Sequence, residues 1–170
     1  MAARPDPEVG FRRPGDHRRA DGVVERRVFV QATPRVVWAT LHDPASLSTI
    51  FPEFEFGPAP PSWPAVATSR AGRARIGLLR EVARAESVEA RPEAVFRMRL
   101  TGSGFQSEWS WRLEPLAGGT RVLHIGQLEA MDRWAGILVR LGRATVESRV
   151  EGHLRALKDR AEAIERSPVT

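Results

Sequence analysis

Hydrophobic and polar residues alternate from Val23 to Gln31, with Val24, Val28 and Val30 on one side. A period of two residues is typical of a β-strand that buries one face. The same alternation places Arg26 on the buried face, at the far end of the strand. The pattern therefore predicts that the domain begins with a strand.

Two short helices are predicted directly after this strand. Thr33 can cap the first helix through its hydroxyl, and Pro34 suits the first helical position because its missing N–H would have no partner there. Asp43 and Pro44 repeat this arrangement for the second helix. The apolar residues of the two helices are Val36, Val37, Trp38, Leu41, Leu47 and Ile50.

Strand-like runs separated by turn signals follow the proline-rich stretch 57–64. We interpret Ala71 and Gly72 as the first of these turns. Short connections of this kind are typical of an antiparallel meander. The predicted strands cover residues 65–70, 73–89, 94–101, 105–114 and 120–128.

A long helix is predicted from Met131 to about Glu165, because apolar residues recur there at three- and four-residue spacing. His153 lies beside this apolar stripe. After a single curved sheet, the stripe has no other surface to bury against. The predicted fold class is therefore α+β: a seven-stranded antiparallel curved sheet wrapped around a long C-terminal helix, with open space between them. The stripe consists of Trp134, Leu138, Leu141, Val150, Leu154, Leu157, Ala161 and Ile164.

Composition indicates one ordinary globular domain, with 42% hydrophobic and 28% charged residues in 170. Residues 1–22 lack a periodic apolar pattern, and we interpret them as a flexible arm before a single domain at 23–166. No run reaches the roughly 18 apolar residues of a transmembrane helix. The first twenty residues also lack the apolar region of a signal peptide, so we expect a cytoplasmic location.

The net charge of +5 comes almost entirely from arginine. Only residues 70–99, with eight arginines and four glutamates, form a basic block. A nucleic-acid interface would be a denser stripe with aromatic residues for base stacking. We therefore expect no nucleic-acid partner.

Two residue types are absent. The chain has no cysteine, which excludes disulfides, thiolate catalysis and cysteine-bound metals, and no tyrosine, which removes one possible general acid. Its four histidines are scattered without metal-ligand spacing. We predict neither a metal nor another cofactor.

The order of these elements resembles the helix-grip, or START-like, fold, and more narrowly the bacterial polyketide cyclase/dehydrase branch of the SRPBCC superfamily. The resemblance covers about residues 23–165 and implies a cavity that the long helix closes on one side. Members include lipid carriers, aromatase/cyclases and quinone-binding proteins, so the fold alone does not settle the function. The segments that carry the resemblance are FVQATPRVVWATLHDPASLSTIFPEF (29–54), SVEARPEAVFRM (87–98), WSWRLEPLAGGTRV (109–122) and VEGHLRALKDRAEA (150–163).

Strand parity selects the residues that would face such a cavity. With Val82 and Val88 as core anchors, Arg84 and Glu86 point inward, and the last strand brings His124 inward. A slip of one residue would reverse each assignment. The other candidate ligand-binding residues, which equally fit a packed core, are Trp38, Phe96, Met98, Trp109, Trp111, Trp134 and Leu138.

Two of these candidates carry possible chemistry. His124 is the candidate general acid or base because imidazole titrates near neutral pH; the alternative is a core histidine bonded to a neighbouring strand. Arg84 with Glu86 could bind a carbonyl or phenol oxygen; the alternative is a solvated sheet face.

Three functions stay open from the sequence. The first is a carrier or sensor, monomeric or homodimeric, of a small hydrophobic molecule such as an aromatic polyketide, a quinone or a lipid. The second is a polyketide cyclase or aromatase in which His124 moves protons and Arg84 stabilises an enolate oxygen. The third is a protein-interaction module that uses the apolar stripe and the basic block. We prefer binding to catalysis because the sequence offers little catalytic equipment.

Overall fold

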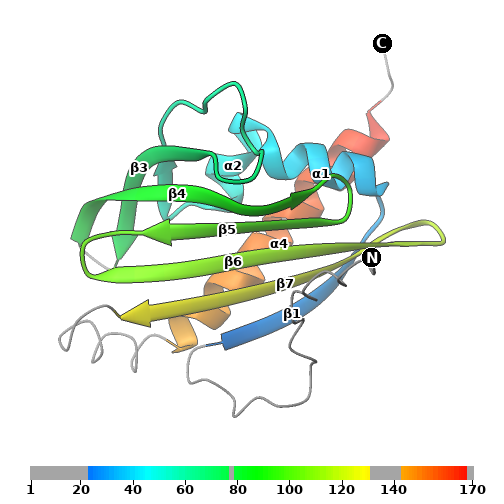
Figure 1. The fold of residues 1–170 in the computed structure, drawn as a ribbon. Coiled ribbons are helices and arrows are strands. Elements are labelled where there is room, and N and C mark those ends of the chain that lie inside the picture. The colour runs from blue at the N-terminus through cyan, green and yellow to red at the C-terminus, as the bar shows by residue number, and fades with distance from the viewer. Residues whose placement is uncertain (1–22, 77–78, 131–142, 168–170) are drawn as a thin grey trace, which may run out of the picture.

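A computed structural model describes residues 23–76, 79–130 and 143–167 (Figure 1). The helices are α1 (Pro34–His42), α2 (Pro44–Ile50) and α4 (Arg143–Arg166). The strands are β1 (Val23–Val30), β2 (Phe54–Phe56), β3 (Ser69–Ile76), β4 (Leu79–Arg91), β5 (Val95–Thr101), β6 (Phe105–Leu116) and β7 (Gly119–Ala130).

The strands form one antiparallel sheet in the order β1-β7-β6-β5-β4-β3-β2. Figure 1 shows α4 crossing behind this curved sheet, with α1 and α2 grouped near one of its ends. The fold class predicted from the sequence is confirmed. The predicted arm at 1–22 and the first part of the predicted terminal helix lie outside the described residues.

Both short helices begin at the predicted caps. The Thr33 hydroxyl accepts a hydrogen bond from the Val36 amide at 3.4 Å, and the Asp43 carboxylate accepts one from the Ser46 amide at 2.8 Å. These bonds pair backbone donors that have no partner within the helix. The prediction of two consecutive capped helices is confirmed.

The predicted turn at Ala71 and Gly72 is wrong, because both residues lie inside β3. Gly72 has a different role: a Cβ atom there would lie 2.4 Å from the Glu55 carbonyl oxygen and 2.5 Å from the Phe54 ring. Glycine therefore lets β2 and the Phe54 ring approach β3 closely.

The core lies between the inner face of the sheet and the helices. Helix α4 buries one stripe of side chains there, as its periodicity predicts. No helix in the described part of the chain is long and apolar enough to cross a membrane. The buried apolar residues of α4 are Val146, Val150, Leu154, Leu157 and Ala161.

Candidate functional site

A row of rings crosses the inner face of the central strands. Phe96 of β5 pairs with Trp111 of β6, which pairs in turn with His124 of β7. Met98 and Trp109 form the adjacent row, and all five side chains are at most 1% exposed. Their predicted inward placement is confirmed, and a role in ligand binding stays a prediction.

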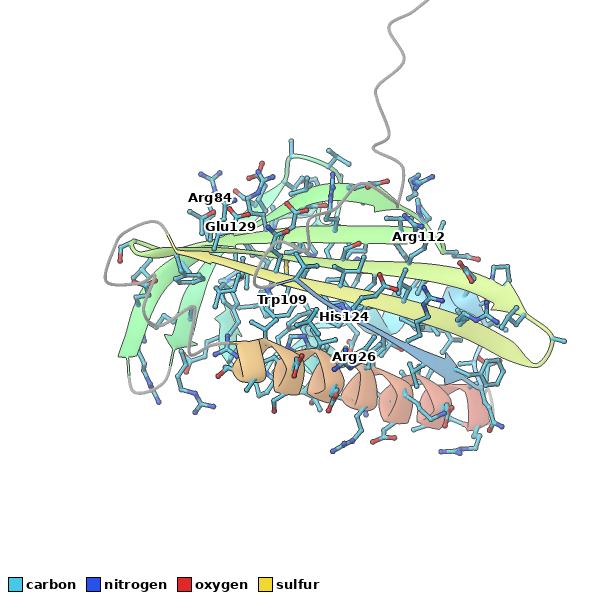
Figure 2. All side chains as sticks on the ribbon, turned by 90° about the horizontal axis from the view of Figure 1, so that it is seen from below. Arg26, Arg84, Trp109, Arg112, His124 and Glu129 are labelled. Carbon is cyan, nitrogen blue, oxygen red and sulfur yellow. The ribbon has the colours of Figure 1, made fainter. Side chains whose placement is uncertain are left out.

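The inward placement predicted for Arg84 and Glu86 is wrong. Figure 2 shows Arg84 on the side of the sheet away from α4, whereas His124 lies between the sheet and α4. Val82, the assumed core anchor, is 75% exposed. Small residues fill the inner face of β4, so side-chain size does not mark its buried set. The inward residues are Ala83, Ala85 and Ser87.

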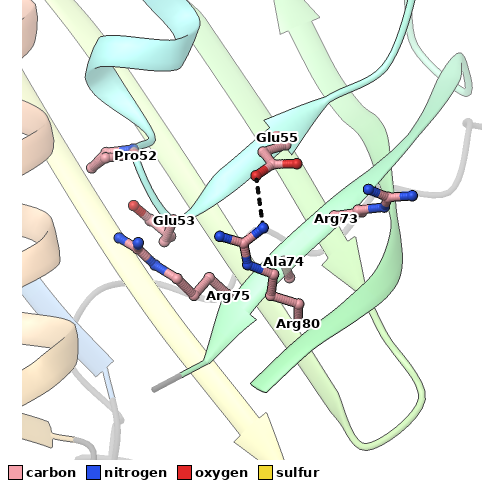
Figure 3. A pocket seen from close by; sticks show the side chains of 7 residues that line it. All are labelled: Pro52, Glu53, Glu55, Arg73, Ala74, Arg75 and Arg80. Atoms are coloured by element: carbon pink, nitrogen blue, oxygen red, sulfur yellow. Dashed lines mark ion pairs between the residues drawn. The ribbon is translucent and has the colours of Figure 1, made fainter. Parts of the chain in front are cut away.

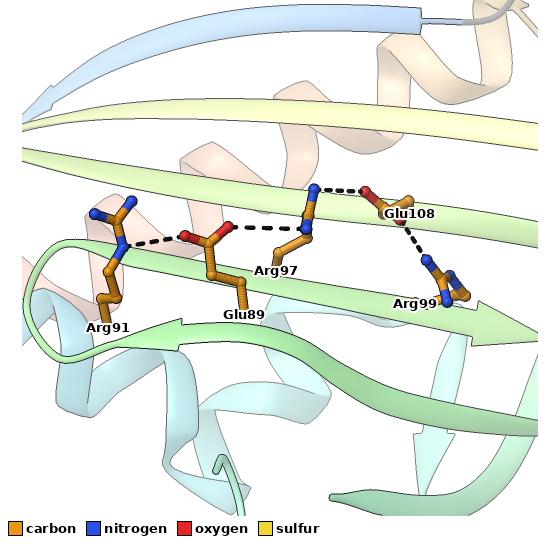
Figure 4. Close-up of polar contacts among 5 residues, drawn as sticks. All are labelled: Glu89, Arg91, Arg97, Arg99 and Glu108. Atoms are coloured by element: carbon orange, nitrogen blue, oxygen red, sulfur yellow. Dashed lines mark hydrogen bonds and ion pairs between the residues drawn. The ribbon is translucent and has the colours of Figure 1, made fainter. Parts of the chain in front are cut away.

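The outer face of the sheet carries much of the predicted basic block, and part of it is neutralised. Glu108 pairs with Arg97 at 3.5 Å and with Arg99 at 3.2 Å, while Glu89 pairs with Arg91 at 3.0 Å (Figure 4). Exposed ion pairs of this kind add little stability. They do, however, break up the positive stripe that an acidic partner would need.

His124 is fixed by contacts on its ring face and at both ring nitrogens. The imidazole stacks on the Trp111 indole, with 4.4 Å between centroids and 14° between planes. Its Nδ1 lies 2.9 Å from the Ser110 carbonyl oxygen, and its Nε2 lies 3.1 Å from Nδ1 of His153. Neither ring nitrogen is left for a ligand. His124 is therefore a core histidine bonded to a neighbouring strand, the alternative that the sequence left open.

His153 extends this contact to a carboxylate. It projects from α4, and its Nε2 lies 2.7 Å from Oε1 of Glu53, which lies between α2 and β2. The His153 side chain is 1% exposed and that of Glu53 is 11% exposed. Together with His124, these residues form a buried series that we call the His–His–Glu network.

The geometry fixes where the protons lie in this network. Nδ1 of His124 must donate to the Ser110 carbonyl, so Nε2 accepts from His153. Burial, with the charge on His153, lowers the pKa of His124 well below its ordinary range. Burial opposes ionisation of Glu53, but the hydrogen bond from His153 and its charge outweigh burial and hold the pKa of Glu53 below its ordinary value. With Glu53 ionised, both ring nitrogens of His153 act as donors, Nδ1 to His124 and Nε2 to Glu53.

The network ends at a small surface pocket beside Glu53, between β2, β3 and β4 (Figure 3). Its volume is about 30 Å³, enough for one or two water molecules and far below the roughly 300–1,000 Å³ of a small-molecule site. In the described part of the chain, no three side chains converge as metal ligands. The network links α4 to the sheet and is not itself a ligand pocket.

A second group of side chains surrounds Phe96, and we call it the Phe96 cluster. Ring centroids lie 4.6 Å from Phe96 for His42, 6.1 Å for Trp63 and 5.8 Å for Trp111. The Arg70 guanidinium lies 5.5 Å from the Trp63 ring. The members come from α1, the connection 57–68, β3, β5 and β6: Trp38, His42, Trp63, Arg70, Phe96 and Trp111.

Four members of this cluster each have a buried polar atom that no described residue pairs by a hydrogen bond. The atoms are Nε2 of His42, Nε1 of Trp63, Nη1 of Arg70 and Nε1 of Trp111. Buried polar groups in proteins are nearly always paired, and each unpaired group costs about 1–3 kcal/mol. The four unpartnered atoms all belong to the Phe96 cluster.

His42 enters this cluster as a neutral acceptor. Its Nδ1 lies 2.7 Å from the Trp38 carbonyl oxygen and must donate to it. Burial lowers the pKa of His42 from 6.5 to about 4, and the bond to Trp38 opposes this only in part. At neutral pH its Nε2 therefore presents a lone pair toward the Phe96 cluster.

The depressed pKa of His42 predicts a pH-dependent stability. The unfolded chain takes up a proton below pH 6.5, but the folded chain does so only near pH 4, so the free energy of unfolding falls as pH drops between these values. His124 acts in the same direction. Urea unfolding at several pH values between 7 and 4.5 gives the change of the unfolding free energy with pH. His42→Gln should make this pH dependence shallower by up to about 1.4 kcal/mol per pH unit. An unchanged pH dependence in His42→Gln would contradict the depressed pKa of His42.

The open space expected between sheet and helix is filled along the Phe96–Trp111–His124 row, where each ring is at most 1% exposed. Two surface pockets lie at the β2–β3–β4 edge. Within the Phe96 cluster, Trp63 is partly exposed and sits on an irregular connection. Trp63 is therefore the one ring of the cluster that no helix or strand holds.

The sequence of residues 21–162 matches the family model described as polyketide cyclase / dehydrase and lipid transport. The chain belongs to this family. The search of the curated proteins found no matching relative. The expected membership in the SRPBCC, polyketide cyclase/dehydrase branch is thus confirmed.

Solved structures share the fold of this polyketide cyclase family member. The Zhui aromatase/cyclase from Streptomyces sp. R1128 is 18% identical, with 85% of this chain and 96% of that chain covered and a TM-score of 0.66. A protein from Thermus thermophilus is 21% identical, with 84% and 98% covered and a TM-score of 0.63. A conserved protein from Geobacillus kaustophilus is 15% identical, with 82% and 94% covered and a TM-score of 0.66. At these identities the likeness establishes the helix-grip fold of the family member.

The residues predicted for the site do not include His42, Glu53, Trp63 or Arg70, and the sequence places His153 only beside the apolar stripe of the last helix. Arg70, Gly72 and Ala74 alternate with exposed residues along β3, and this alternation could have predicted that Arg70 points inward. The turn predicted at residues 71 and 72 divided the strand and hid the pattern. Trp38 lies beside Phe96, at 6.2 Å between centroids, and its role in ligand binding stays a prediction. Trp134 and Leu138 lie outside the described residues.

Proposed function

We propose that this polyketide cyclase family member binds a small, flat, largely apolar molecule in the Phe96 cluster, where its ring takes the place of the Trp63 indole. The observation that carries the proposal is the set of unpartnered polar atoms on His42, Arg70 and Trp111, which stay in the cluster when the indole moves. An aromatic polyketide or a quinone has both the flat rings and the oxygens that these atoms need. A plain acyl chain would leave the atoms unpaired.

Catalysis by His124 is less well supported than binding. Both His124 nitrogens already have partners inside the protein, and Arg84 lies on the outer face, where it donates to Ser69 at 2.6 Å. A cyclase that used these two residues would need both to move. We therefore propose a carrier or sensor rather than a cyclase, and its cytoplasmic location stays a prediction.

The proposal predicts stabilisation by a neutral flat ligand with one hydroxyl group, such as 2-naphthol. At a concentration one hundred times its Kd, 2-naphthol should add about 2.7 kcal/mol to the free energy of unfolding. For a chain of this length the melting temperature should rise by about 5–10 °C. Differential scanning calorimetry measures the shift, and native mass spectrometry of freshly purified protein shows whether a natural ligand is retained.

Two variants localise this binding. Trp63→Leu shrinks the side chain that the ligand must displace and should therefore tighten 2-naphthol binding about two- to tenfold. The matched control is Phe29→Leu, because Phe29 is an aromatic residue on β1 that is 41% exposed and lies outside the cluster. The absence of any melting shift with millimolar 2-naphthol, or an equal change of affinity in both variants, would count against the proposed site.

A further inference from the structure

Arg70 is a buried cation without an ionic partner. It is 6% exposed and points to the inner face from β3. Its Nε donates to the Gly57 carbonyl oxygen at 3.1 Å, and its Nη2 donates to the same oxygen. Its Nη1 has no partner, and within the described ranges no carboxylate lies within 4.0 Å of its guanidinium.

This arrangement is unusual for arginine. Burial lowers the pKa of Arg70, but a guanidinium stays protonated in proteins, so the charge persists. Buried arginines are normally paired with an anion, because an unpaired buried charge is strongly unfavourable. Among the described residues Arg70 is the only buried arginine, and the arginines at 91, 97 and 99 on the outer face all have glutamate partners.

The Arg70 guanidinium lies next to two aromatic rings. Its guanidinium carbon lies 4.8 Å from the centroid of Phe56 and 5.5 Å from that of Trp63. The Trp63 ring is also 6.1 Å from Phe96. A flat ring that replaced the Trp63 indole would therefore have Phe96 as one neighbour and the Arg70 charge as another.

The polar atoms of the cluster are mostly donors. With the Trp63 indole displaced, Arg70 and Trp111 each offer an unpartnered N–H, whereas His42 alone offers an acceptor. A ligand that satisfies this set must be rich in acceptor oxygens. A carboxylate meets the need because it accepts several hydrogen bonds and pairs with a guanidinium.

We propose that the ligand is an aromatic carboxylate whose acid group pairs with Nη1 of Arg70 while its ring packs against Phe96. This inference rests on the proposed function, since it assigns the chemical class of the molecule held at the same site. The carboxylate supplies the missing negative charge, and the displaced Trp63 leaves the space for the ring.

The test compares two probes of the same shape, 2-naphthoate and its neutral amide, 2-naphthamide, by isothermal titration calorimetry at pH 7. The wild-type protein should bind 2-naphthoate at least about tenfold more tightly. Arg70→Gln keeps a donor for the Gly57 carbonyl but loses the charge, and should abolish this preference while 2-naphthamide binding stays within about threefold. The matched control is Arg84→Gln, an exposed arginine on the outer face, which should leave the preference unchanged.

A second variant covers the case in which Arg70→Gln does not fold, as judged by circular dichroism. Arg70→Lys keeps the charge but not the planar fork, so it should retain a reduced preference for 2-naphthoate. Equal binding of both probes by the wild-type protein, or an undiminished preference in Arg70→Gln or Arg70→Lys, would overturn the inference and leave the proposed function standing. Failure of both probes to bind would overturn both.

Discussion

Replacing Trp111 with alanine should lower the free energy of unfolding by about 3–5 kcal/mol, the range typical of removing a fully buried tryptophan. The Trp111 indole is 0% exposed. Its centroid lies 4.4 Å from that of His124, 5.8 Å from Phe96 and 5.3 Å from Phe51. Alanine would leave a cavity bounded by rings that cannot all move to fill it. Urea unfolding at pH 7 measures the change.

Two companion variants make this prediction specific. Val82→Ala, at a side chain that is 75% exposed, should change the free energy of unfolding by less than about 0.5 kcal/mol. Trp111→Phe keeps an aromatic ring against His124 and Phe96, so its free energy of unfolding should fall less than that of Trp111→Ala. A loss below about 1 kcal/mol for Trp111→Ala would show that the rings collapse into the space and that the cluster is loosely packed.

Replacing His153 with leucine should lower the free energy of unfolding at pH 7 by about 3–5 kcal/mol, because it leaves the Glu53 carboxylate buried without its cation. It also removes the donor to Nε2 of His124. The double variant Glu53→Gln/His153→Leu should be more stable than His153→Leu, since glutamine carries no charge to desolvate. Urea unfolding of the three proteins tests this order.

The pH dependence of the same proteins provides a separate test. In the wild type the pKa of Glu53 is depressed, so the stability that its ionisation contributes is present above its ordinary pKa and is lost as pH falls through the folded value. In His153→Leu the unpaired carboxylate should take up a proton more readily when folded than when unfolded. The difference in unfolding free energy between His153→Leu and the double variant should then become smaller from pH 7 to pH 5. A constant difference would show that Glu53 is not charged in the variant.

The buried face of a strand was predictable from the sequence where large apolar residues mark it, and not where that face carries small residues. Valine and leucine mark the buried face of β1 and β7, and Arg26 lies where parity placed it, 3.3 Å from Glu151 of α4. In β4 the inward residues are alanine and serine, so the more hydrophobic Val82 misled the assignment. Parity also placed His124 correctly, because its strand has larger neighbours on the same face.

The candidate site depends on contacts that no local pattern encodes. Glu53 and His153 are 100 residues apart and meet only because α4 crosses the sheet at the end of α2. The rings around Phe96 come from separate segments of the chain, and the proline-rich stretch 57–64 indicates only a loop or an edge, with a strand predicted at 65–70. Their unpartnered atoms appear only once all of these segments are in place.

Ser87 determines how the site can open. Its hydroxyl donates to the Pro64 carbonyl at 2.6 Å, its amide donates to Thr68 at 2.9 Å, and its carbonyl accepts from the Ala67 amide at 2.9 Å. These bonds fasten the second half of the segment that carries Trp63, directly after the indole. Under the proposed function, displacing Trp63 would therefore leave residues 64–68 bonded to β4, and the backbone change would fall on the residues before Pro64.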